Sequence, residues 1–376
     1  MSPTARRLVI LTEGLWHIHN AKTATGVIRY GQDDVVALLD STIAGRNVEE
    51  WLPGHDIPAV ATLQEALASP RGRPDALLIG IAPTGGRLPT EWRVTILEAI
   101  RAGLDVLSGL HTFLGDDPEF RAAAREAGVH IVDYRRPPDR METAVGRKHL
   151  PGKRVILTVG TDCAIGKMSV ALELRRAGTG AGRSVVFTPT GQTGMMIDGW
   201  GVAIDRVISD FVQGTCEWLL EEAESRGDWI LVEGQGSLDH PAYSSVTLGL
   251  IHGTTPHAMV LVHKPGLAAH DFDHRPDLSF PIAKLPAFIA LHESVAGLVA
   301  PSKVVGVALN TMLYPDDAAA RRVIDEIAEE TGLPTDDPVR FGGDRLWPAV
   351  RDGVDALPWV RGSLPVVSTS GATPST

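Results

Sequence analysis

The feature that most constrains the fold of this chain is a short apolar segment that runs into a loop bounded by glycines. The segment covers residues 155–159, and the loop from Gly160 to Gly166 leads into Lys167 and a longer amphipathic stretch. Backbone N–H groups of such a loop, and of the helix after it, converge on an anion. Glycine permits close approach of the backbone, and lysine adds a positive charge. The pattern predicts a buried strand, a phosphate-binding loop and a helix.

This loop departs from the ordinary P-loop in two ways. Five residues separate its glycines where the usual motif has four, and the longer spacing resembles the dethiobiotin synthetase-like branch of P-loop proteins. Met168 follows the lysine in place of the usual Ser or Thr, and Ser169 is turned about 100° further round a helix. A glycine-rich turn that binds nothing is the alternative. The predicted cofactor-binding residues of this loop are Gly160, Thr161, Asp162, Cys163, Ala164, Ile165, Gly166, Lys167, Met168 and Ser169.

Short apolar runs alternate with amphipathic stretches along most of the chain. Most runs lack a polar–apolar alternation, which is typical of strands covered on both faces. Alternating strands and helices indicate an α/β fold with a doubly wound, mainly parallel sheet. We expect strands at residues 8–11, 35–39, 76–81, 155–159, 185–187, 229–232, 259–262 and 304–309. We expect helices at residues 91–102, 118–127, 167–177, 215–225 and 316–331.

The length of 376 residues predicts two domains. A polar, basic and proline-bearing segment at residues 135–152 separates two strand–helix series. We therefore expect an N-terminal domain at residues 1–145 and a phosphate-loop domain at residues 146–361. The final residues, 362–376, are rich in Ser, Thr, Pro and Gly and are expected to form a disordered tail.

The charge and the cysteine content of the chain indicate which kinds of partner it binds and in which compartment it lies. The chain has 35 Lys and Arg against 46 Asp and Glu, a net charge of −11, which argues against a nucleic-acid partner. Two cysteines are too few for a disulfide framework or a four-cysteine zinc site. No apolar run approaches the ~20 residues of a membrane helix, and the first run is too short for a signal peptide. We expect a cytoplasmic protein that acts on a small molecule, without a membrane partner, and that forms homo-oligomers.

A second set of polar residues follows a later apolar run. Glu233 stands at the carboxyl end of a predicted strand, where it either serves a ligand site beside the phosphate loop or caps a helix. The pair Asp239–His240 is a candidate general base, with an exposed loop as the alternative. Gln192 and Thr193 lie in another strand-end loop, which suits a phosphate or carbonyl contact or is a plain turn. Three further aspartates either bind a substrate ammonium group or are solvated: Asp198, Asp205 and Asp210.

Three histidines raise the question of a metal site. His263, His270 and His274 lie close in sequence, with Asp271 and Asp273 between the last two. His270 and His274 would share a face only in a helix, and two nearby prolines argue against a long helix there. We therefore expect loop histidines with hydrogen-bonding or substrate roles, and we predict no metal ligands.

The N-terminal half lacks the G-x-G-x-x-G pattern of a dinucleotide site, which argues against NAD. Lys22 and Arg29, with the acid-ended run at residues 35–40, form either an anion or substrate pocket or a support surface for the other domain. The candidate substrate-binding residues of the chain are Lys22, Arg29, Tyr30, Gln235 and Tyr243.

Taken together, these segments resemble the D-glutamate N-acetyltransferase (DgcN) family of P-loop proteins. The resemblance spans about residues 6–360 and is carried by G-T-D-C-A-I-G-K from Gly160, T-G-Q-T-G-M-M-I from Thr190, E-G-Q-G-S-L from Glu233 and H-P-A-Y-S from His240. Further matches are K-T-A-T-G-V-I-R-Y-G from Lys22 and G-V-A-L-N-T from Gly306. The resemblance implies a Rossmann-like N-terminal domain, a P-loop C-terminal domain, and transfer of acetyl from acetyl-CoA to the amino group of D-glutamate or a related D-amino acid.

This implied activity gives the unusual phosphate loop a use, because coenzyme A carries phosphates and acetyl transfer hydrolyses no phosphoanhydride. The reaction needs a base for the amine and donors for the thioester oxyanion. The expected base is His240 or Asp239, with Glu233 as the rival. N–H groups near residues 192–194 or 234–236 would serve the oxyanion. Lys22 or Arg29 would hold a substrate carboxylate.

The main alternative is an ATP- and magnesium-dependent ligase or kinase that acts on a small carboxylate. The phosphate loop and Glu233 favour it, and Met168 argues against it. A nucleotide-binding switch is more distant, since the segment at Asn310 lacks the Lys and Asp of an N-K-x-D motif. Magnesium dependence would separate the acetyltransferase from the ligase or kinase.

Overall fold

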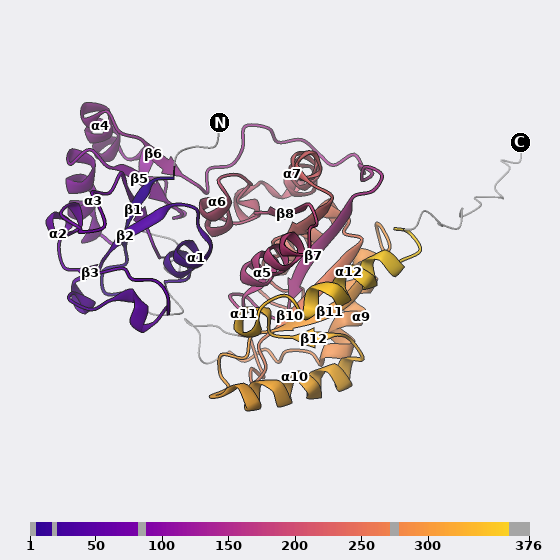
Figure 1. Cartoon of the computed structure of the whole chain (residues 1–376). Coiled ribbons are helices and arrows are strands. Elements are labelled where there is room, and N and C mark those ends of the chain that lie inside the picture. Colours follow the sequence, from indigo (N-terminus) through magenta and orange to yellow (C-terminus); the bar gives the residue numbers. More distant parts are fainter. Residues whose placement is uncertain (1–4, 17–20, 82–87, 271–277, 361–376) are drawn as a thin grey trace, which may run out of the picture.

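The computed structural model describes residues 5–16, 21–81, 88–270 and 278–360. Two six-stranded sheets, one in each half of the chain, carry the fold (Figure 1). Every strand pair within the described residues is parallel. The predicted α/β class with doubly wound parallel sheets is confirmed.

The N-terminal sheet has the strand order β3-β2-β1-β4-β5-β6, which is the order of a Rossmann sheet. Its apolar strands are buried on both faces because helices cover each side. The strands are β1 Arg7–Leu11, β2 Asp34–Leu39, β3 Ala59–Val60, β4 Ala76–Ile79, β5 Asp105–Ser108 and β6 Ile131–Asp133. The helices are α1 Lys22–Tyr30, α2 Leu63–Leu67, α3 Trp92–Arg101 and α4 Pro118–Ala127.

The C-terminal sheet has the order β12-β11-β10-β7-β9-β8, with β7 near its middle. The chain returns past β7 between β9 and β10, so the loop after β7 lies where the strand order reverses. The strands are β7 Arg154–Gly160, β8 Val185–Thr188, β9 Trp229–Val232, β10 Ala258–His263, β11 Lys303–Leu309 and β12 Thr335–Asp336. The helices are α5 Lys167–Gly180, α6 Gln192–Asp198, α7 Val212–Arg226, α8 Ser244–Thr254, α9 Leu285–Ala296, α10 Asp317–Thr331, α11 Pro338–Phe341 and α12 Leu346–Ala356.

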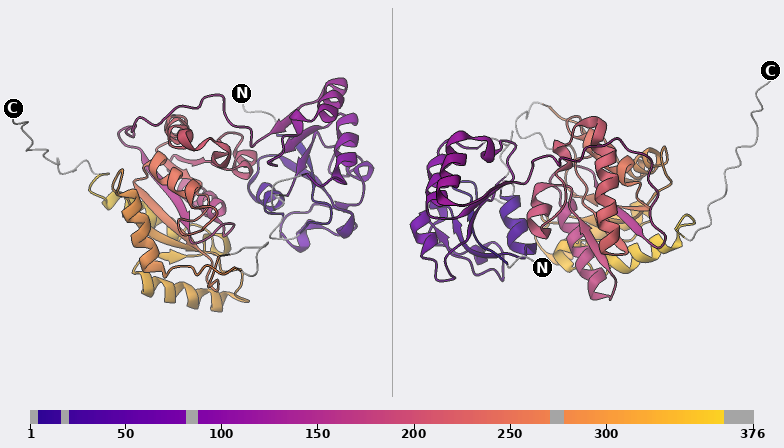
Figure 2. Two further views of the ribbon diagram at one scale, coloured as in Figure 1. Left: turned by 180° about the vertical axis from the view of Figure 1, so that it is seen from behind. Right: turned by 90° about the horizontal axis from the view of Figure 1, so that it is seen from above.

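The two domains meet along α1 on one side and α5 and α6 on the other (Figures 1 and 2). One apolar core cluster runs across this contact, from Val27 and Ile28 of α1 to Met196 and Ile197 of α6. The hydroxyl groups of Thr23 and Thr193 lie 3.0 Å apart in the same interface. Packing and a buried polar contact thus fix how the strand ends of the two sheets approach each other.

The segment between the sheets, residues 134–153, contains the expected domain boundary at residues 145–146, which stays a prediction. The expected disordered tail lies outside the described residues. No helix within the described part of the chain is long and apolar enough to cross a membrane.

Candidate active site

The candidate site lies where the carboxyl ends of the strands in both sheets face the domain contact. Parallel strands bring the loops after β7, β8, β9 and β10 to one edge of the C-terminal sheet. The reversal of strand order between β1 and β4 opens a crevice in the N-terminal sheet. Helix α1 begins at Lys22 beside that crevice and packs against α6. The two crevices therefore meet.

The predicted phosphate loop joins β7 to α5 and has the backbone that its glycines require. Gly166 has a φ of 112° and Ala164 a φ of 53°, both in the left-handed region. Gly166 is the N-cap of α5 and brings no capping side chain, so the first N–H groups of α5 have no side-chain partner. They point at the place where an anion would bind. The Nδ2 group of Asn310 donates to the Ile165 carbonyl (3.0 Å) and holds the loop in this shape.

The side chain of Lys167 folds back into the loop and bonds to its backbone. Its buried ammonium group donates to the Asp162 carbonyl at 2.6 Å. Burial lowers the pKa of Lys167, and the nearby Cys163 and Asp162 oppose that shift. The Cys163 thiol is half-buried on the same loop, and burial raises its pKa. The raised pKa of Cys163 favours the protonated thiol over a reactive thiolate on this loop.

Glu233 directly follows β9 and is 5 % exposed. Its Oε2 atom accepts hydrogen bonds from the backbone N–H groups of Thr190 (3.0 Å) and Gly191 (3.2 Å). Burial raises the pKa of Glu233 to about 7, although the two N–H groups act in the opposite direction. The expectation that Glu233 caps a helix is therefore partly met, since Gly191 is the N-cap of α6. A carboxyl group that titrates near neutral pH is also suited to proton transfer.

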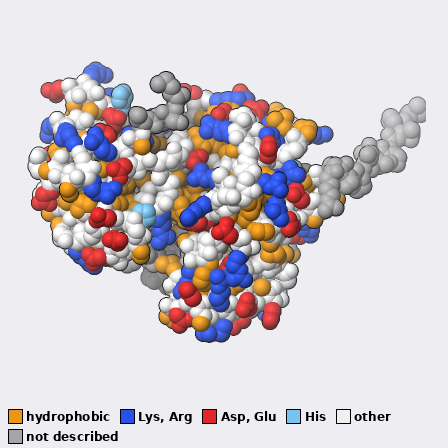
Figure 3. Space-filling view, viewed as in Figure 1, with side chains coloured by type: hydrophobic (Ala, Val, Ile, Leu, Met, Phe, Trp, Pro, Cys, Tyr) orange, Lys and Arg blue, Asp and Glu red, His pale blue; other side chains and the backbone are white. Residues whose placement is uncertain are grey.

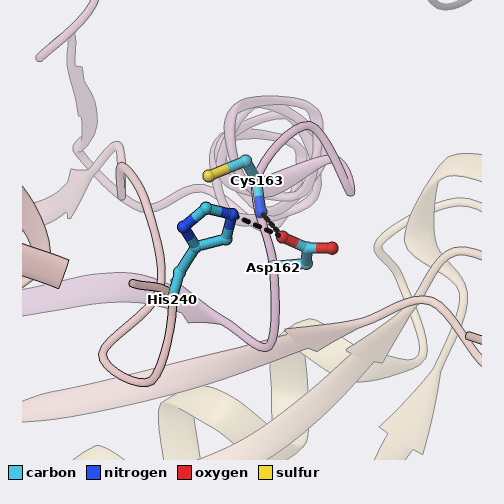
Figure 4. Close-up of side chains that lie close together, drawn as sticks. All are labelled: Asp162, Cys163 and His240. Atoms are coloured by element: carbon cyan, nitrogen blue, oxygen red, sulfur yellow. Dashed lines mark hydrogen bonds and ion pairs between the residues drawn. The ribbon is translucent and has the colours of Figure 1, made fainter. Parts of the chain in front are cut away.

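Two histidines and two aspartates lie beside the phosphate loop: His240, His270, Asp162 and Asp239. All are buried except Asp239, which is partly exposed, and we call the group the histidine–aspartate cluster. His270 stands between the two carboxylates, with Nδ1 3.3 Å from Asp162 Oδ1 and Nε2 3.2 Å from Asp239 Oδ1. His240 Nε2 lies 3.9 Å from Asp162 Oδ1 (Figure 4). Asp239 also accepts a hydrogen bond from Ser237 (2.7 Å). The rings of the two histidines pack edge to face, with 68° between their planes.

The hydrogen bonds of His240 bear on its use as a base. The N–H group of Ala242 donates to His240 Nδ1 (3.1 Å), so the neutral ring carries its proton on Nε2, facing Asp162. Burial lowers the pKa of His240, which favours that neutral form. The nitrogen nearest the phosphate loop therefore carries a proton and is a donor, not a base.

The hydrogen bond from Ala242 to His240 Nδ1 also affects whether His240 can bind a metal ion. Possible ligand atoms of Asp162, Cys163 and His240 lie within 4.8 Å of one another (Figure 4). A histidine that binds a metal donates its second N–H to an acceptor, but His240 Nδ1 accepts here. The arrangement suits a hydrogen-bonded cluster better than a metal centre through His240 Nε2. His263 instead pairs with the Thr161 hydroxyl (2.9 Å), and burial lowers its pKa to about 4.

Lys22, at the start of α1, brings the N-terminal domain into this site. Its side chain is exposed, yet surrounding protein lowers its pKa, with Arg135 adding to the effect and Cys163, Asp205 and Glu233 opposing it. Lys22 is therefore within electrostatic reach of both Cys163 of the phosphate loop and Glu233.

The other residues singled out in the sequence divide into four groups. Thr193 bonds to Thr23, and Gln192 packs against Gly109, so both side chains serve the domain contact. Gln235 donates to the Thr190 hydroxyl (3.3 Å), and Tyr243 lies against the His240 ring. The structure separates two members from the rest, because Arg29 and Tyr30 line a second pocket at the other end of α1. The remaining candidates, Asp271, Asp273 and His274, lie outside the described residues.

Arg135 is a residue of the site that no sequence pattern indicated. This residue of the inter-sheet segment is 8 % exposed, donates to the Gly109 carbonyl (2.7 Å) and pairs with Asp205. Asp198 and Asp210 are the other aspartates considered for a substrate ammonium group. Asp198 pairs with Arg175, and Asp210 is exposed. Each ion pair joins residues far apart in the chain, and no local pattern could have indicated it.

Comparison with protein families agrees with this architecture. Residues 142–347 match the family described as "Domain of unknown function (DUF1611_C) P-loop domain". Residues 41–137 match its companion, "Domain of unknown function (DUF1611_N) Rossmann-like domain". A crystal structure of a DUF1611 family protein from Anabaena variabilis superposes with a TM-score of 0.86 at 39 % identity, covering 92 % of this chain and 99 % of that one.

Two curated relatives carry a functional name. A D-glutamate N-acetyltransferase of Tritonibacter scottomollicae is 35 % identical over 332 residues, which is 82 % of this chain and 92 % of the relative. A D-glutamate N-acetyltransferase of Pseudoalteromonas sp. is 38 % identical over 273 residues, which is 72 % of this chain and 79 % of the relative. The chain is a member of the DUF1611 family, and these two enzymes are its relatives.

Proposed function

We propose that this protein transfers acetyl from acetyl-CoA to the amino group of D-glutamate or a closely related D-amino acid. The observation that carries the proposal is the similarity to two D-glutamate N-acetyltransferases over most of both chains. The residues of the candidate site lie in segments that also carry the resemblance in sequence. The geometry supplies a phosphate loop, a carboxyl group that titrates near neutral pH, and a cation on the opposite domain.

The phosphate loop would hold the phosphates of coenzyme A. The uncapped N-terminus of α5 offers N–H groups, and Lys167 adds a positive charge from within the loop. Met168 packs beside Gly26 of α1, at the position where an NTPase carries its magnesium hydroxyl. A donor that binds through phosphates but needs no magnesium for its chemistry fits such a loop.

Glu233 is the base in this proposal. Its Oε2 atom is held by two N–H groups, whereas Oε1 accepts no hydrogen bond from the described residues. Oε1 takes a proton from the substrate ammonium group, and the freed amine attacks the thioester carbonyl carbon. The C–S bond then breaks, the leaving thiolate recovers the first proton from Glu233, and the acylated nitrogen releases its second proton to water. This assignment replaces His240, whose Nε2 carries a proton, and Asp239, which already accepts from Ser237.

Lys22 would bind a carboxylate of the amino-acid substrate, because it lies within electrostatic reach of Glu233. The oxyanion donors expected near residues 192–194 stay a prediction. Of the oxyanion donors expected near residues 234–236, the Gly234 N–H group is already used, since it donates to the Thr158 hydroxyl (2.9 Å).

An ATP- and magnesium-dependent ligase or kinase is the second candidate, favoured by the phosphate loop and by Glu233 at the end of β9. Thermal-shift titration with acetyl-CoA and with ATP, each with and without magnesium, separates the two. A ligand that binds only the folded protein stabilises it by about 2.7 kcal/mol at 100 times its Kd. We expect acetyl-CoA to raise the melting temperature without magnesium. Stabilisation by magnesium-ATP alone would favour the second candidate.

A further inference from the structure

A second pocket lies between the two domains, at the opposite end of α1 from Lys22. It has a volume of about 660 Å³ and is lined from both domains. Figure 3 shows the hollow between the domains with Lys and Arg side chains along it. Arg29 and Tyr30, which the sequence predicts to bind the substrate, line this pocket. Arg29 lies seven residues after Lys22, which is about 10 Å along the helix, so the two ends of α1 contribute to different sites.

The charge of this pocket is positive. Arg29, Arg175 and Arg176 line it, against the single carboxylate of Glu173. Arg175 already pairs with Asp198. The Arg29 side chain forms no hydrogen bond or ion pair with another described residue. The Arg176 side chain is 85 % exposed and makes only a long ion pair, 4.0 Å, with Glu173. These two guanidinium groups come from different domains, and both can turn toward an anion in the pocket.

Part of the wall is apolar. Leu52 and Pro53 of the N-terminal domain face Leu172 of α5 and Val339 of α11 across the pocket. Burial raises the pKa of Glu173, and its carboxylate accepts a hydrogen bond from the Tyr30 hydroxyl. Apolar walls beside two cations suit a flat heterocycle that carries a phosphate.

The pocket and the phosphate loop share helix α5 and are linked by Tyr30. The Tyr30 hydroxyl donates to Glu173 (3.1 Å) and also bonds to Ser169, two residues beyond Lys167. Leu172 lies five residues after Lys167, about 8 Å along the helix. One nucleoside can bridge that span, with its phosphates at opposite ends.

We propose that this pocket binds the 3′-phosphorylated adenosine of coenzyme A, while the phosphate loop binds the pyrophosphate of the same molecule. The inference rests on the proposed acetyl transfer and adds the subsite that recognises the donor. Arg29 and Arg176 contact the 3′-phosphate, and the apolar walls cover the adenine. Because the two arginines belong to different domains, donor binding draws the domains together at α1.

The test compares acetyl-CoA with 3′-dephospho-acetyl-CoA as donors for the full-length protein. Wild-type protein should use acetyl-CoA about tenfold better in kcat/KM, the effect of a charge-assisted contact of about 1.4 kcal/mol. Arg29→Gln and Arg176→Gln should each lose about this factor with acetyl-CoA and change little with the dephosphorylated donor. Arg121→Gln, an exposed arginine on α4, is the matched control and should behave as wild type.

Isothermal titration with adenosine 3′,5′-bisphosphate runs alongside and needs no turnover. Binding that weakens in Arg29→Gln and Arg176→Gln, but not in Arg121→Gln, supports the subsite. Equal use of both donors by wild-type protein overturns the subsite and leaves acetyl transfer standing. A rise in KM for D-glutamate with unchanged acetyl-CoA kinetics would return Arg29 to the amino-acid substrate. No turnover with either donor would contradict the proposed function, and the titration would then decide the pocket by itself.

Discussion

Glu233 is the residue on which the proposed chemistry depends most. Replacing it by Gln keeps an oxygen for the Thr190 and Gly191 N–H groups but removes the proton acceptor. We expect Glu233→Gln to lower kcat by about 10²–10⁴-fold, the usual contribution of a general base. Because the carboxylate is the active form, the wild-type rate should rise with pH through an apparent pKa of about 7. Steady-state kinetics between about pH 5.5 and 8.5 measure both the loss of kcat in the variant and the pH dependence of the wild-type rate.

Asp239→Asn and His240→Gln are the comparisons for this variant, since these residues are the rival bases. Both lie in the histidine–aspartate cluster, so their loss should affect the site through packing and hydrogen bonding. A smaller loss in kcat than in Glu233→Gln is expected for each. Wild-type kcat in Glu233→Gln would show that the base lies elsewhere.

The raised pKa of Glu233 also predicts how stability depends on pH. Burial makes the native carboxyl bind its proton more tightly than the unfolded one, whose reference pKa is 4.5. This favours the native state below pH 4.5, and the advantage is lost as pH rises through about 7. The change amounts to about 3 kcal/mol. Melting temperatures of wild type should therefore fall relative to Glu233→Gln between about pH 5 and 8, and a constant difference would contradict the assigned pKa.

For Lys22 we predict an effect on substrate binding rather than on the catalytic rate. Lys22→Met removes this positive charge from the site and should raise KM for D-glutamate about tenfold, with little change for acetyl-CoA. Lys148→Met, which alters an exposed lysine of the inter-sheet segment, is the control. Unchanged KM for D-glutamate in Lys22→Met would remove this residue from the substrate site.

At the level of single residues, the sequence predicted what a strand end or a loop motif can indicate. Lys167, Glu233 and His240 follow from such patterns. The separation of Lys22 from Arg29 could not be predicted, because it depends on which end of α1 faces which domain. The role of Arg135 could not be predicted either, since its partner Asp205 lies 70 residues away in sequence.

Helix α6 shows how elements of the two domains position the site. Gly109, after β5, packs so closely on α6 that an added Cβ would stand 2.6 Å from Gln192 Cγ. Gly109→Ala should therefore push the domains apart and cost about 1–3 kcal/mol, measured by chemical denaturation. Acetyl transfer should fall as well, because α6 supplies the N-cap that holds Glu233.

Gly180, in the last turn of α5, is the matched control for this substitution. No atom lies within 4 Å of a Cβ added there, so Gly180→Ala should be neutral or slightly stabilising. Equal stability of Gly109→Ala and wild type would show that the contact with Gln192 relaxes without cost.

All eight expected strands and all five expected helices appear within a few residues of their predicted bounds. Several elements of similar length were not predicted, among them β5, α8, α9 and α12. The two-residue strands β3 and β12 are too short to give an apolar pattern. Helix α1 was missed because Gly26 and its Thr, Val and Ile residues have low helix propensity. It forms because packing against α6 outweighs that local preference.

The whole molecule combines an acidic chain with a basic site. The net charge is −11, yet the proposed donor and amino acid are both anions. Lys22 and Lys167 from opposite domains, together with the arginines of the second pocket, concentrate positive charge where the domains meet. Distant surface charges are screened over about 10 Å at ordinary salt, so the local charge governs binding. Assembly into homo-oligomers stays a prediction.

The most direct test of the account is acetyl transfer itself. Purified full-length protein is mixed with acetyl-CoA and either D- or L-glutamate, without added magnesium, and N-acetylglutamate and free coenzyme A are quantified by liquid chromatography and mass spectrometry. The account predicts equal amounts of the two products with D-glutamate, much less with L-glutamate, and near loss of both in Glu233→Gln. Absence of N-acetyl-D-glutamate, or its formation only when ATP and magnesium are added, would contradict it.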